Sequence, residues 1–146
     1  MPNLPIKLLR PDAKLPTRAT DGSAGYDLCA VLDAPCTLAP GDHAVIGTGI
    51  AIALPSSDCA AFVFARSGLA TKHGIAPANA VGVIDSDYRG EIRVGLVNHY
   101  DAPYTITPGE RIAQLLFLPV LLPALVPVDS LPETERGSGG FGSTGS

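Results

Sequence analysis

The sequence predicts an all-β fold, a sandwich or barrel built from short strands. Sixteen glycines and fourteen prolines divide the 146-residue chain into short segments, and such frequent turn residues interrupt long elements of any kind. The segments between the turns are rich in Val, Ile and other strand-forming residues. Apart from one short helical turn, no segment has the 12-residue amphipathic pattern of a surface helix. A chain of this length is expected to form one domain.

Five runs are predicted to be strands: residues 43–54, 60–64, 81–84, 91–98 and 111–118. One helical turn is expected over residues 68–73, where Ser67 would cap the first turn and Gly74 would end it. The domain body is expected to cover residues 1–132. A flexible, Gly/Ser-rich tail would follow over residues 133–146.

The charge and hydropathy of the chain limit its partners. The formal net charge is −4, whereas binding to polymeric nucleic acid needs a basic surface. A single nucleotide stays compatible, because a few local cations and a metal ion can meet its phosphates. The longest apolar run, residues 115–128, is shorter than the ~20 residues of a membrane helix and is interrupted by prolines. We therefore expect no membrane partner.

The cysteines indicate a reducing compartment. Cys29, Cys36 and Cys59 are odd in number and have no C-x-x-C spacing, so we expect reduced thiols in a cytoplasmic protein. The first twelve residues contain prolines and no sustained apolar region, which argues against a signal peptide.

The segment NAVGVIDSDYRGE carries the most informative pattern. Asp85 and Asp87 lie two residues apart, and Tyr88 follows them between two predicted strands. We interpret this as a β-hairpin that presents an acid and an aromatic ring at its tip, an arrangement that suits the binding and hydrolysis of a nucleotide. A solvated turn is the alternative. A calcium loop is rejected, because Arg89 and Leu96 occupy its fifth and twelfth positions.

Three further sites carry polar groups in apolar surroundings. Arg66-Ser67-Gly68 follows an apolar run and offers a guanidinium, a hydroxyl and backbone N–H groups to an anion. A simple surface helix cap is the alternative. Asp27 is a lone acid in the strand-like run 24–28, where it needs a cation, a metal or backbone donors. Gln114 lies among apolar residues, so its amide needs a partner unless it lies at a strand edge.

The tail allows two interpretations. Residues 137–142 formally match the dinucleotide motif G-x-G-x-x-G, but that motif must open a helix, and only four residues remain here. A disordered linker is the simpler interpretation. Arg136, Phe141, Ser143 and Thr144 favour a second one, a segment that closes over a phosphate-bearing ligand with a flat ring.

The order and spacing of these segments resemble the five ordered motifs of the trimeric dUTP diphosphatases (dUTPases). The matching segments are AGYDL (24–28), RSGLATKHGI (66–75), NAVGVIDSDYRGE (79–91), GERIAQLLF (109–117) and RGSGGFGSTG (136–145). The related dCTP deaminases share the fold but not this full set. Ala65 and Ala78 depart from a Pro and a Gly often found there, and both departures concern backbone shape rather than chemistry.

The resemblance implies a β-clip subunit, a distorted jelly-roll barrel, in a homotrimer with active sites at subunit interfaces. It implies hydrolysis of dUTP to dUMP and pyrophosphate by in-line attack of water on the α-phosphate, with Mg²⁺ as cofactor. Asp85 would be the general base. Asp27 would reach the Mg²⁺ through ordered water, while the substrate phosphates hold the ion directly.

The resemblance also implies substrate-binding residues. Phosphates would be held by Arg66, Ser67, Gly68, Gln114 and, at the γ-phosphate, Arg136. Uracil would contact Asn79 and backbone groups of Val83 and Ile84, under a cover formed by Phe141. Tyr88 would stack under the deoxyribose and exclude a 2′-hydroxyl. The implied set is completed by Arg93, Ser143 and Thr144.

Two rival interpretations stay open. A dCTP deaminase of the same fold would release ammonia. A non-enzymatic trimeric β scaffold would bind no nucleotide. For the diphosphatase, the resemblance implies two cellular roles, which are limiting uracil in DNA and supplying dUMP for dTTP synthesis.

Overall fold

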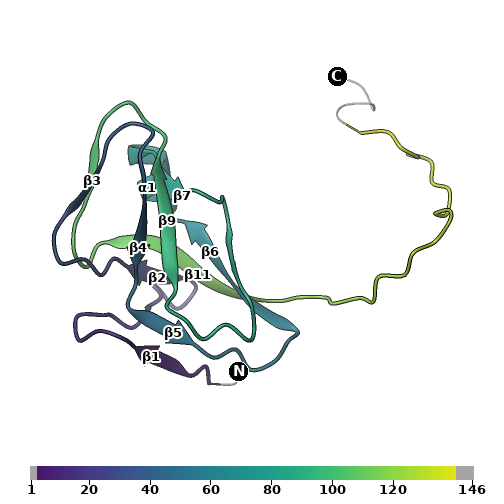
Figure 1. Cartoon of the computed structure of the whole chain (residues 1–146), viewed down its shortest axis with the longest axis horizontal. Helices are drawn as coiled ribbons and strands as arrows, with labels where there is room; N and C mark the ends of the chain where they lie inside the picture. The colour runs from purple at the N-terminus through teal and green to yellow at the C-terminus, as the bar shows by residue number, and fades with distance from the viewer. Residues whose placement is uncertain (1–2, 141–146) are drawn as a thin grey trace.

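Eleven short strands and one α-helix make up residues 3–140, the part of the chain that the computed structural model describes (Figure 1). In chain order they are β1 (Ile6–Leu8), β2 (Tyr26–Cys29), β3 (Cys36–Leu38), β4 (His43–Gly47), β5 (Ile50–Ile52), β6 (Cys59–Ala65), α1 (Ser67–His73), β7 (Ile75–Pro77), β8 (Gly82–Ile84), β9 (Arg93–Asn98), β10 (Tyr104–Ile106) and β11 (Arg111–Pro119). The prediction of an all-β chain with one short helix is therefore confirmed. The strand pattern did not indicate β1, β3, β7 or β10, which have only three residues each.

Within residues 3–140, seven antiparallel ladders join the strands into four sheets. The largest is a four-stranded sheet in the order β2-β11-β6-β8, and β4-β9-β7 form a three-stranded sheet. Two further pairs, β1 with β5 and β10 with β3, extend the body at its ends. Within residues 3–140 these ladders do not close into a barrel, so the jelly-roll-like subunit is an open one.

One hydrophobic core lies between the sheets. Along β9, Val94, Leu96 and Asn98 are buried and alternate with more accessible residues, as the two-residue period of a strand requires. Asn98 is fully buried because its side-chain amide makes hydrogen bonds to three backbone groups. The largest side chains of the core are Leu28, Ile46, Ile50, Ile75, Leu96, Ile106, Ile112 and Leu115.

The run predicted as one strand over residues 43–54 is two strands, β4 and β5. They are separated by a corner at Thr48 and Gly49. Gly49 has a φ of +66°, a conformation that favours glycine, and its N–H bonds the Glu91 carboxylate instead of a neighbouring strand. The corner takes the chain from the ladder with β9 to the ladder with β1.

Helix α1 ends where the sequence predicts but begins differently. Gly74 ends it in the left-handed conformation, with a φ of +70°, and its N–H bonds the Ala70 carbonyl. The prediction that Ser67 caps the helix is wrong. Arg66 occupies the cap position with an extended backbone and makes no side-chain capping bond, so Ser67 is already the first helical residue.

The hairpin predicted around Asp85 is not a paired hairpin. β8 pairs with β6, whereas β9 pairs with β4 and β7, so the strands on either side of the turn belong to different sheets. Polar–apolar alternation shows which face of a strand is buried but not which strand is its neighbour. The segment 85–92 is therefore a connection between two sheets.

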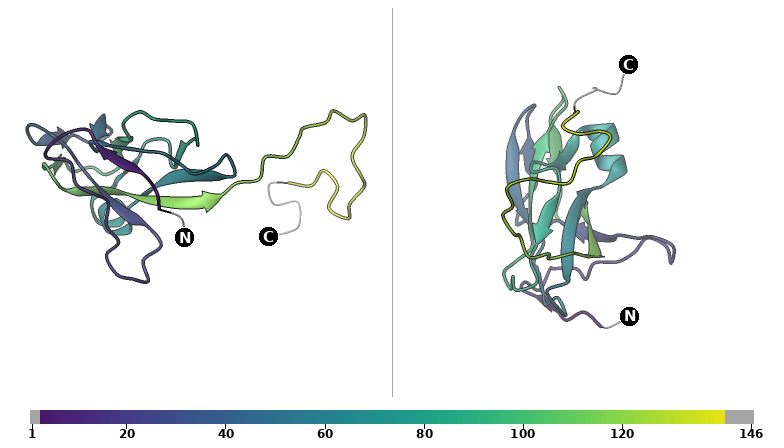
Figure 2. Two further views of the ribbon diagram at one scale, coloured as in Figure 1. Left: turned by 90° about the horizontal axis from the view of Figure 1, so that it is seen from below. Right: turned by 90° about the vertical axis from the view of Figure 1, so that its right-hand side faces the viewer.

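After Pro119 the chain leaves the body as an extended segment, the C-terminal arm (residues 120–140). Figure 1 and the left view of Figure 2 show it continuing from the end of β11 without folding back over the strands. Its large apolar side chains are exposed, and Leu121, Leu122, Leu125, Val126, Val128 and Leu131 are between 63 and 94% accessible. The boundary expected at residue 132 stays a prediction. Among residues 3–140, no helix is long and apolar enough to cross a membrane.

Candidate active site

A pocket of about 270 Å³ lies between β8 and β9. Its walls come from the segment around the Asp85 turn and from the adjoining strands. The lining residues are Val63, Pro77, Asn79, Gly82, Val83, Ile84, Asp85, Tyr88, Glu91, Ile92, Arg93, Val94 and Gly95. Every residue that the sequence predicted as a nucleobase or sugar contact within 79–93 lines this one pocket.

The pocket is open because two strand edges that face it have no neighbour. β8 is the last strand of its sheet within the described residues. On the side of β9 away from β4, β7 pairs only with residues 96–98, and Ala78 donates to the Gly95 carbonyl. Beyond that point, no strand among residues 3–140 lies on this side of β9. Unpaired backbone donors and acceptors at an edge are free to bind a ligand.

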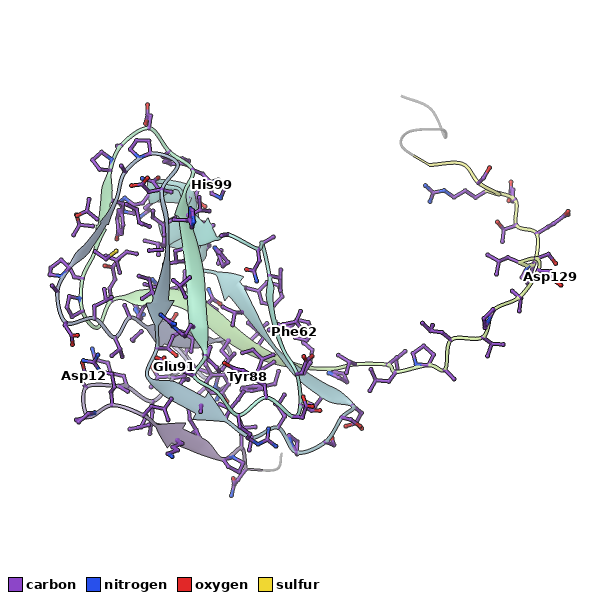
Figure 3. All side chains as sticks on the ribbon, viewed as in Figure 1. Asp12, Phe62, Tyr88, Glu91, His99 and Asp129 are labelled. Atoms are coloured by element: carbon purple, nitrogen blue, oxygen red, sulfur yellow. The ribbon has the colours of Figure 1, made fainter. Side chains whose placement is uncertain are left out.

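Asp85 and Tyr88 lie at the turn that borders the pocket. Asp85 is exposed, and its carbonyl accepts the Tyr88 N–H at 3.2 Å. The Tyr88 hydroxyl donates to the Glu91 carbonyl at 2.9 Å, and Figure 3 shows the two residues side by side. A Cβ on Gly90 would lie 2.6 Å from Cζ of Tyr88, so this glycine leaves room for the ring. The ring is thus held across the turn.

The other pocket residues differ in exposure. Val83 is 60% accessible, whereas Ile84 is buried against the core. Asn79 is exposed, and its Nδ2 lies 3.8 Å from the place where a Cβ on Gly82 would be. Arg93 lies at the first position of β9 with an exposed side chain. The apolar lining residues Val83, Ile84 and Val94 lie on β8 and β9, whereas Asn79, Asp85 and Tyr88 come from the segments outside these strands.

A second polar cluster surrounds Asp27. The Asp27 carboxylate accepts a hydrogen bond from Nε of Arg66 at 2.9 Å through one oxygen and from Nη1 of Arg111 at 3.1 Å through the other. The Asp27 side chain is only 11% exposed, so the two guanidinium groups offset most of the cost of burying its charge. The sequence predicts that Asp27 needs a cation, a metal or backbone donors, and in the structure its partners are these two arginines.

Strand register brings the other predicted phosphate contacts to the same end of the sheet. Gln114 on β11 lies opposite Asp27 on β2. A Cβ on Gly25 would lie 2.8 Å from Oε1 of Gln114, so the amide lies against the Gly25 backbone. Ser67 and Gly68 follow Arg66 directly and are exposed. The four residues predicted to hold phosphates, Arg66, Ser67, Gly68 and Gln114, therefore come from the end of β6, the start of α1 and β11.

The two clusters lie at opposite ends of β6 within one chain. Ile84 lies opposite Ala61 near the start of β6, and Asp85 continues past it, whereas Arg66 follows the end of that strand. At about 3.3 Å per residue, the separation along the strand is roughly 20 Å. One chain therefore does not bring Asp85 and Arg66 together on one substrate.

Of the four predicted tail residues, the structure describes only Arg136. Arg136 is on the C-terminal arm, and its Nε donates to the Gly139 carbonyl at 2.9 Å. Phe141, Ser143 and Thr144 lie outside the described residues. Their predicted roles stay predictions.

The residues fit a magnesium ion held mainly by a substrate. No group of three or more metal-ligating side chains occurs within residues 3–140, and both oxygens of Asp27 bond arginines. Mg²⁺ commonly keeps several waters and is bound through one or two carboxylates plus substrate phosphates. The predicted contact of Asp27 with such an ion through water stays a prediction.

Two residues of the site region have no role in the sequence prediction. Arg111 pairs with Asp27, and Glu91 binds the Gly49 N–H. Arg111 opens a predicted strand, but only the pairing of that strand with β2 reveals its partner. Nothing in the sequence places Glu91 beside a glycine 42 residues away.

Comparison with known proteins identifies the family. The dUTPase family model matches residues 11–145. The chain is 57% identical over 132 residues to a deoxyuridine 5′-triphosphate nucleotidohydrolase of Desulfitobacterium hafniense, covering 90% of this chain and 87% of the relative. It is 46% identical to the enzyme of the same description in Serratia proteamaculans, with 99 and 98% coverage.

Solved structures agree with these relatives. A dUTPase of Staphylococcus bacteriophage 80alpha, in complex with dUpNHpp, superposes with a TM-score of 0.90 at 29% identity and covers all of both chains. A variant dUTPase of the S. aureus phage phi11, described as coordinating a structural Mg(II) ion, superposes at 0.81 with 25% identity, covering 90% of this chain and all of the phage chain. On the family match and these relatives, this chain belongs to the dUTPase family.

Proposed function

We propose that this chain hydrolyses dUTP to dUMP and pyrophosphate. Membership of the dUTPase family supports the reaction. The observation that carries the proposal in this chain is the pocket between β8 and β9, which has free strand edges on its walls and the Asp85 carboxylate at its border.

Uracil is proposed to bind between the two strand edges. Backbone N–H and C=O groups near Val83 and Ile84, with the Asn79 amide, would pair with the Watson–Crick edge of the base. Cytosine presents the opposite pattern of donors and acceptors on this edge, so it would leave buried polar groups unpaired. Such a mismatch lowers kcat/KM by a factor on the order of 10⁴. The methyl group of thymine would be excluded sterically, because base and backbone are in close contact.

The Tyr88 ring is proposed to stack under the deoxyribose and to leave no space for a 2′-hydroxyl. The hydrogen bond from its hydroxyl to Glu91 supports a fixed ring position. Phe141 would cover the base from the other side when the tail closes. Arg93, Ser143 and Thr144 complete the proposed contacts.

Asp85 is proposed to act as the general base. Its carboxylate would orient the attacking water behind the α-phosphorus and accept its proton. Arg66, Ser67, Gly68 and Gln114 would hold the phosphates through charge-assisted hydrogen bonds. Arg136 would meet the γ-phosphate. A bound Mg²⁺ would supply charge neutralisation for the leaving pyrophosphate, with Asp27 as an outer ligand through water.

The active site is proposed to form between subunits of a homotrimer. Asp85 and Arg66 lie roughly 20 Å apart along one chain, which is too far for both to act on one dUTP molecule. The exposed apolar side chains of the C-terminal arm also favour assembly, because contiguous apolar surface of this kind marks interfaces. Symmetric oligomers place such patches against each other.

In the cell, the proposed activity would limit uracil in DNA and supply dUMP for dTTP synthesis. The cytoplasm is the proposed compartment. Cys29, Cys36 and Cys59 all carry free thiols, which suits a reducing environment.

The test is to incubate the chain with each dNTP and Mg²⁺ and to measure pyrophosphate and ammonia. Pyrophosphate from dUTP alone is the expected result. Ammonia from dCTP would assign the chain to the deaminases instead. If no nucleotide is bound or turned over, the chain is a scaffold and the proposed function is wrong.

A further inference from the structure

Glu91 lies where the pocket meets the corner between β4 and β5. Its Oε1 accepts the Gly49 N–H at 2.8 Å, and its side chain is 31% exposed. A hydrogen bond between a half-buried carboxylate and a backbone N–H is charge-assisted and stronger than a neutral one. This bond joins the pocket wall to a corner that is distant in sequence.

Gly47 leaves the space in which the carboxylate lies. A Cβ added to Gly47 would be 2.6 Å from Oε1 of Glu91, closer than non-bonded atoms approach. Gly47 has no positive φ among the described backbone angles, so conformation does not require a glycine at this position. A side chain at position 47 would therefore displace the Glu91 carboxylate from its place at the corner.

The backbone after Glu91 is fixed to the same corner. The Ile92 N–H donates to the Ile50 carbonyl at 2.8 Å, and the Thr48 hydroxyl donates to the Ile92 carbonyl. Together with the Glu91 bond, three hydrogen bonds attach this short segment to residues 48–50.

The carbonyl of Glu91 connects the corner to the ring at the pocket. It accepts the Tyr88 hydroxyl at 2.9 Å, so the position of the hydroxyl depends on where the Glu91 backbone is held. Figure 3 shows Glu91 and Tyr88 adjacent below β9. Two hydrogen bonds therefore connect the corner to the ring. One joins the Gly49 N–H to the Glu91 carboxylate, and the other joins the Glu91 carbonyl to the Tyr88 hydroxyl.

We infer that Glu91 is a positioning residue that sets the discrimination between deoxyribose and ribose through Tyr88. The inference rests on the proposed function, because it assigns the Tyr88 ring to the sugar. The role requires the acceptor oxygen, and the charge strengthens its bond to the Gly49 N–H. The nearest cation, Nε of Arg93, is 3.9 Å from Oε2 and its side chain is exposed, so that ion pair contributes little.

The test compares kcat/KM for dUTP with kcat/KM for UTP. Glu91→Ala should lower the dUTP/UTP ratio by about tenfold, because an unanchored ring excludes the 2′-hydroxyl less well and a hydrogen bond is worth about one such factor. Glu91→Gln keeps an acceptor but loses the charge, so its dUTP/UTP ratio should lie between those of Glu91→Ala and the parent. Tyr88→Phe breaks the same path from the other end without touching the corner, so it provides the test if Glu91→Ala does not fold.

Asp101→Ala is the matched control, because it removes a carboxylate that is exposed and lies outside the pocket. It should leave the ratio unchanged. If Glu91→Ala keeps the parental ratio while its melting temperature falls, Glu91 is merely structural and the inference is wrong.

A double-mutant cycle on melting temperature tests the docking itself without any activity. Gly47→Ala should lower the melting temperature of the parent but cause no further loss in Glu91→Ala, because the clash has then been removed. Additive losses would overturn the docking of Glu91 on the corner. A parent that does not hydrolyse dUTP would overturn the proposed function instead, and the cycle would still report on Glu91.

Discussion

Asp27 is a buried carboxylate whose charge is balanced by two arginines from different elements. Arg66 follows β6 and Arg111 begins β11, so this one side chain holds together three adjacent strands of the large sheet. The need for a cation, a metal or backbone donors could be predicted from a lone acid in an apolar run. The identity of both arginines could not, because it follows from the order β2-β11-β6, which sequence periodicity does not encode.

Replacing Asp27 by Asn should destabilise the fold. The change keeps the size of the side chain but leaves two guanidinium groups without their counter-charge, at a cost of about 2 kcal/mol in the free energy of unfolding. Urea unfolding followed by circular dichroism measures it. Asp12→Asn is the control: Asp12 pairs with Arg10 on the surface, and its loss should change little. Equal stability of the Asp27 variant and the parent would contradict this description.

Asp85 is the residue on which the proposed chemistry depends. Asp85→Asn keeps the shape of the side chain but removes its basicity, so dUTP binding should persist while kcat falls by about 10³. Calorimetric titration with a non-hydrolysable dUTP analogue and a pyrophosphate assay measure the two effects. A variant that turns over dUTP at the parental rate would show that another group accepts the proton.

At the scale of elements, the connection after β8 shows what local patterns leave open. The predicted strand boundaries on both sides of Asp85 agree with β8 and β9 to within two residues. Their mutual pairing was predicted wrongly, because burial of Ile84 beside β6 and of Val94 and Leu96 in the core fits two separate sheets equally well. The separation of the two strands is what creates the pocket.

The contacts between α1, β10 and β11 make the stability of the fold depend on pH. The His73 and Tyr104 rings are in contact, with centroids 4.8 Å apart and planes tilted by 44°. The Tyr104 hydroxyl donates to the Glu110 carboxylate. The pKa of Tyr104 is raised from 10.0 to about 12, mainly by burial and secondly by this hydrogen bond. Because the folded state holds this proton more tightly than the unfolded state, the stabilisation is complete below pH 10 and is lost as the pH rises to about 12.

Tyr104→Phe should therefore remove part of the alkaline loss of stability. The free energy of unfolding of the parent should fall more steeply between pH 10 and 12 than that of the variant, because only the parent loses the Tyr104 proton. Urea unfolding at a series of pH values measures the difference. Parallel curves over this range would contradict the raised pKa.

At the scale of the whole molecule, two features favour an assembly of several chains: the exposed apolar arm and the separation of Asp85 from Arg66. Composition and turn residues sufficed to predict the all-β class, and ordered motifs sufficed for the family. The trimer came from the resemblance alone. No sequence pattern shows that Asp85 and Arg66 lie at opposite ends of one strand, because that distance depends on how β8 pairs with β6.

Deletion of residues 133–146 should separate assembly from catalysis. The body and the apolar arm up to Leu131 remain, so the sedimentation coefficient should still indicate a trimer. Loss of Arg136 and of the proposed cover over the base should lower kcat/KM by about 100-fold. Parental kcat/KM in the truncated chain would show that the tail is only a linker.

The most direct measurement is complementation between Asp85→Asn and Arg66→Ala, two variants expected to be inactive alone. Refolded together, they form mixed trimers in which an unaltered Asp85 from one chain meets an unaltered Arg66 from another. Each residue is intact with a probability of one half, so about a quarter of the parental kcat should return. If the mixture stays as inactive as its components, both residues act from the same chain, and a site assembled between subunits is contradicted.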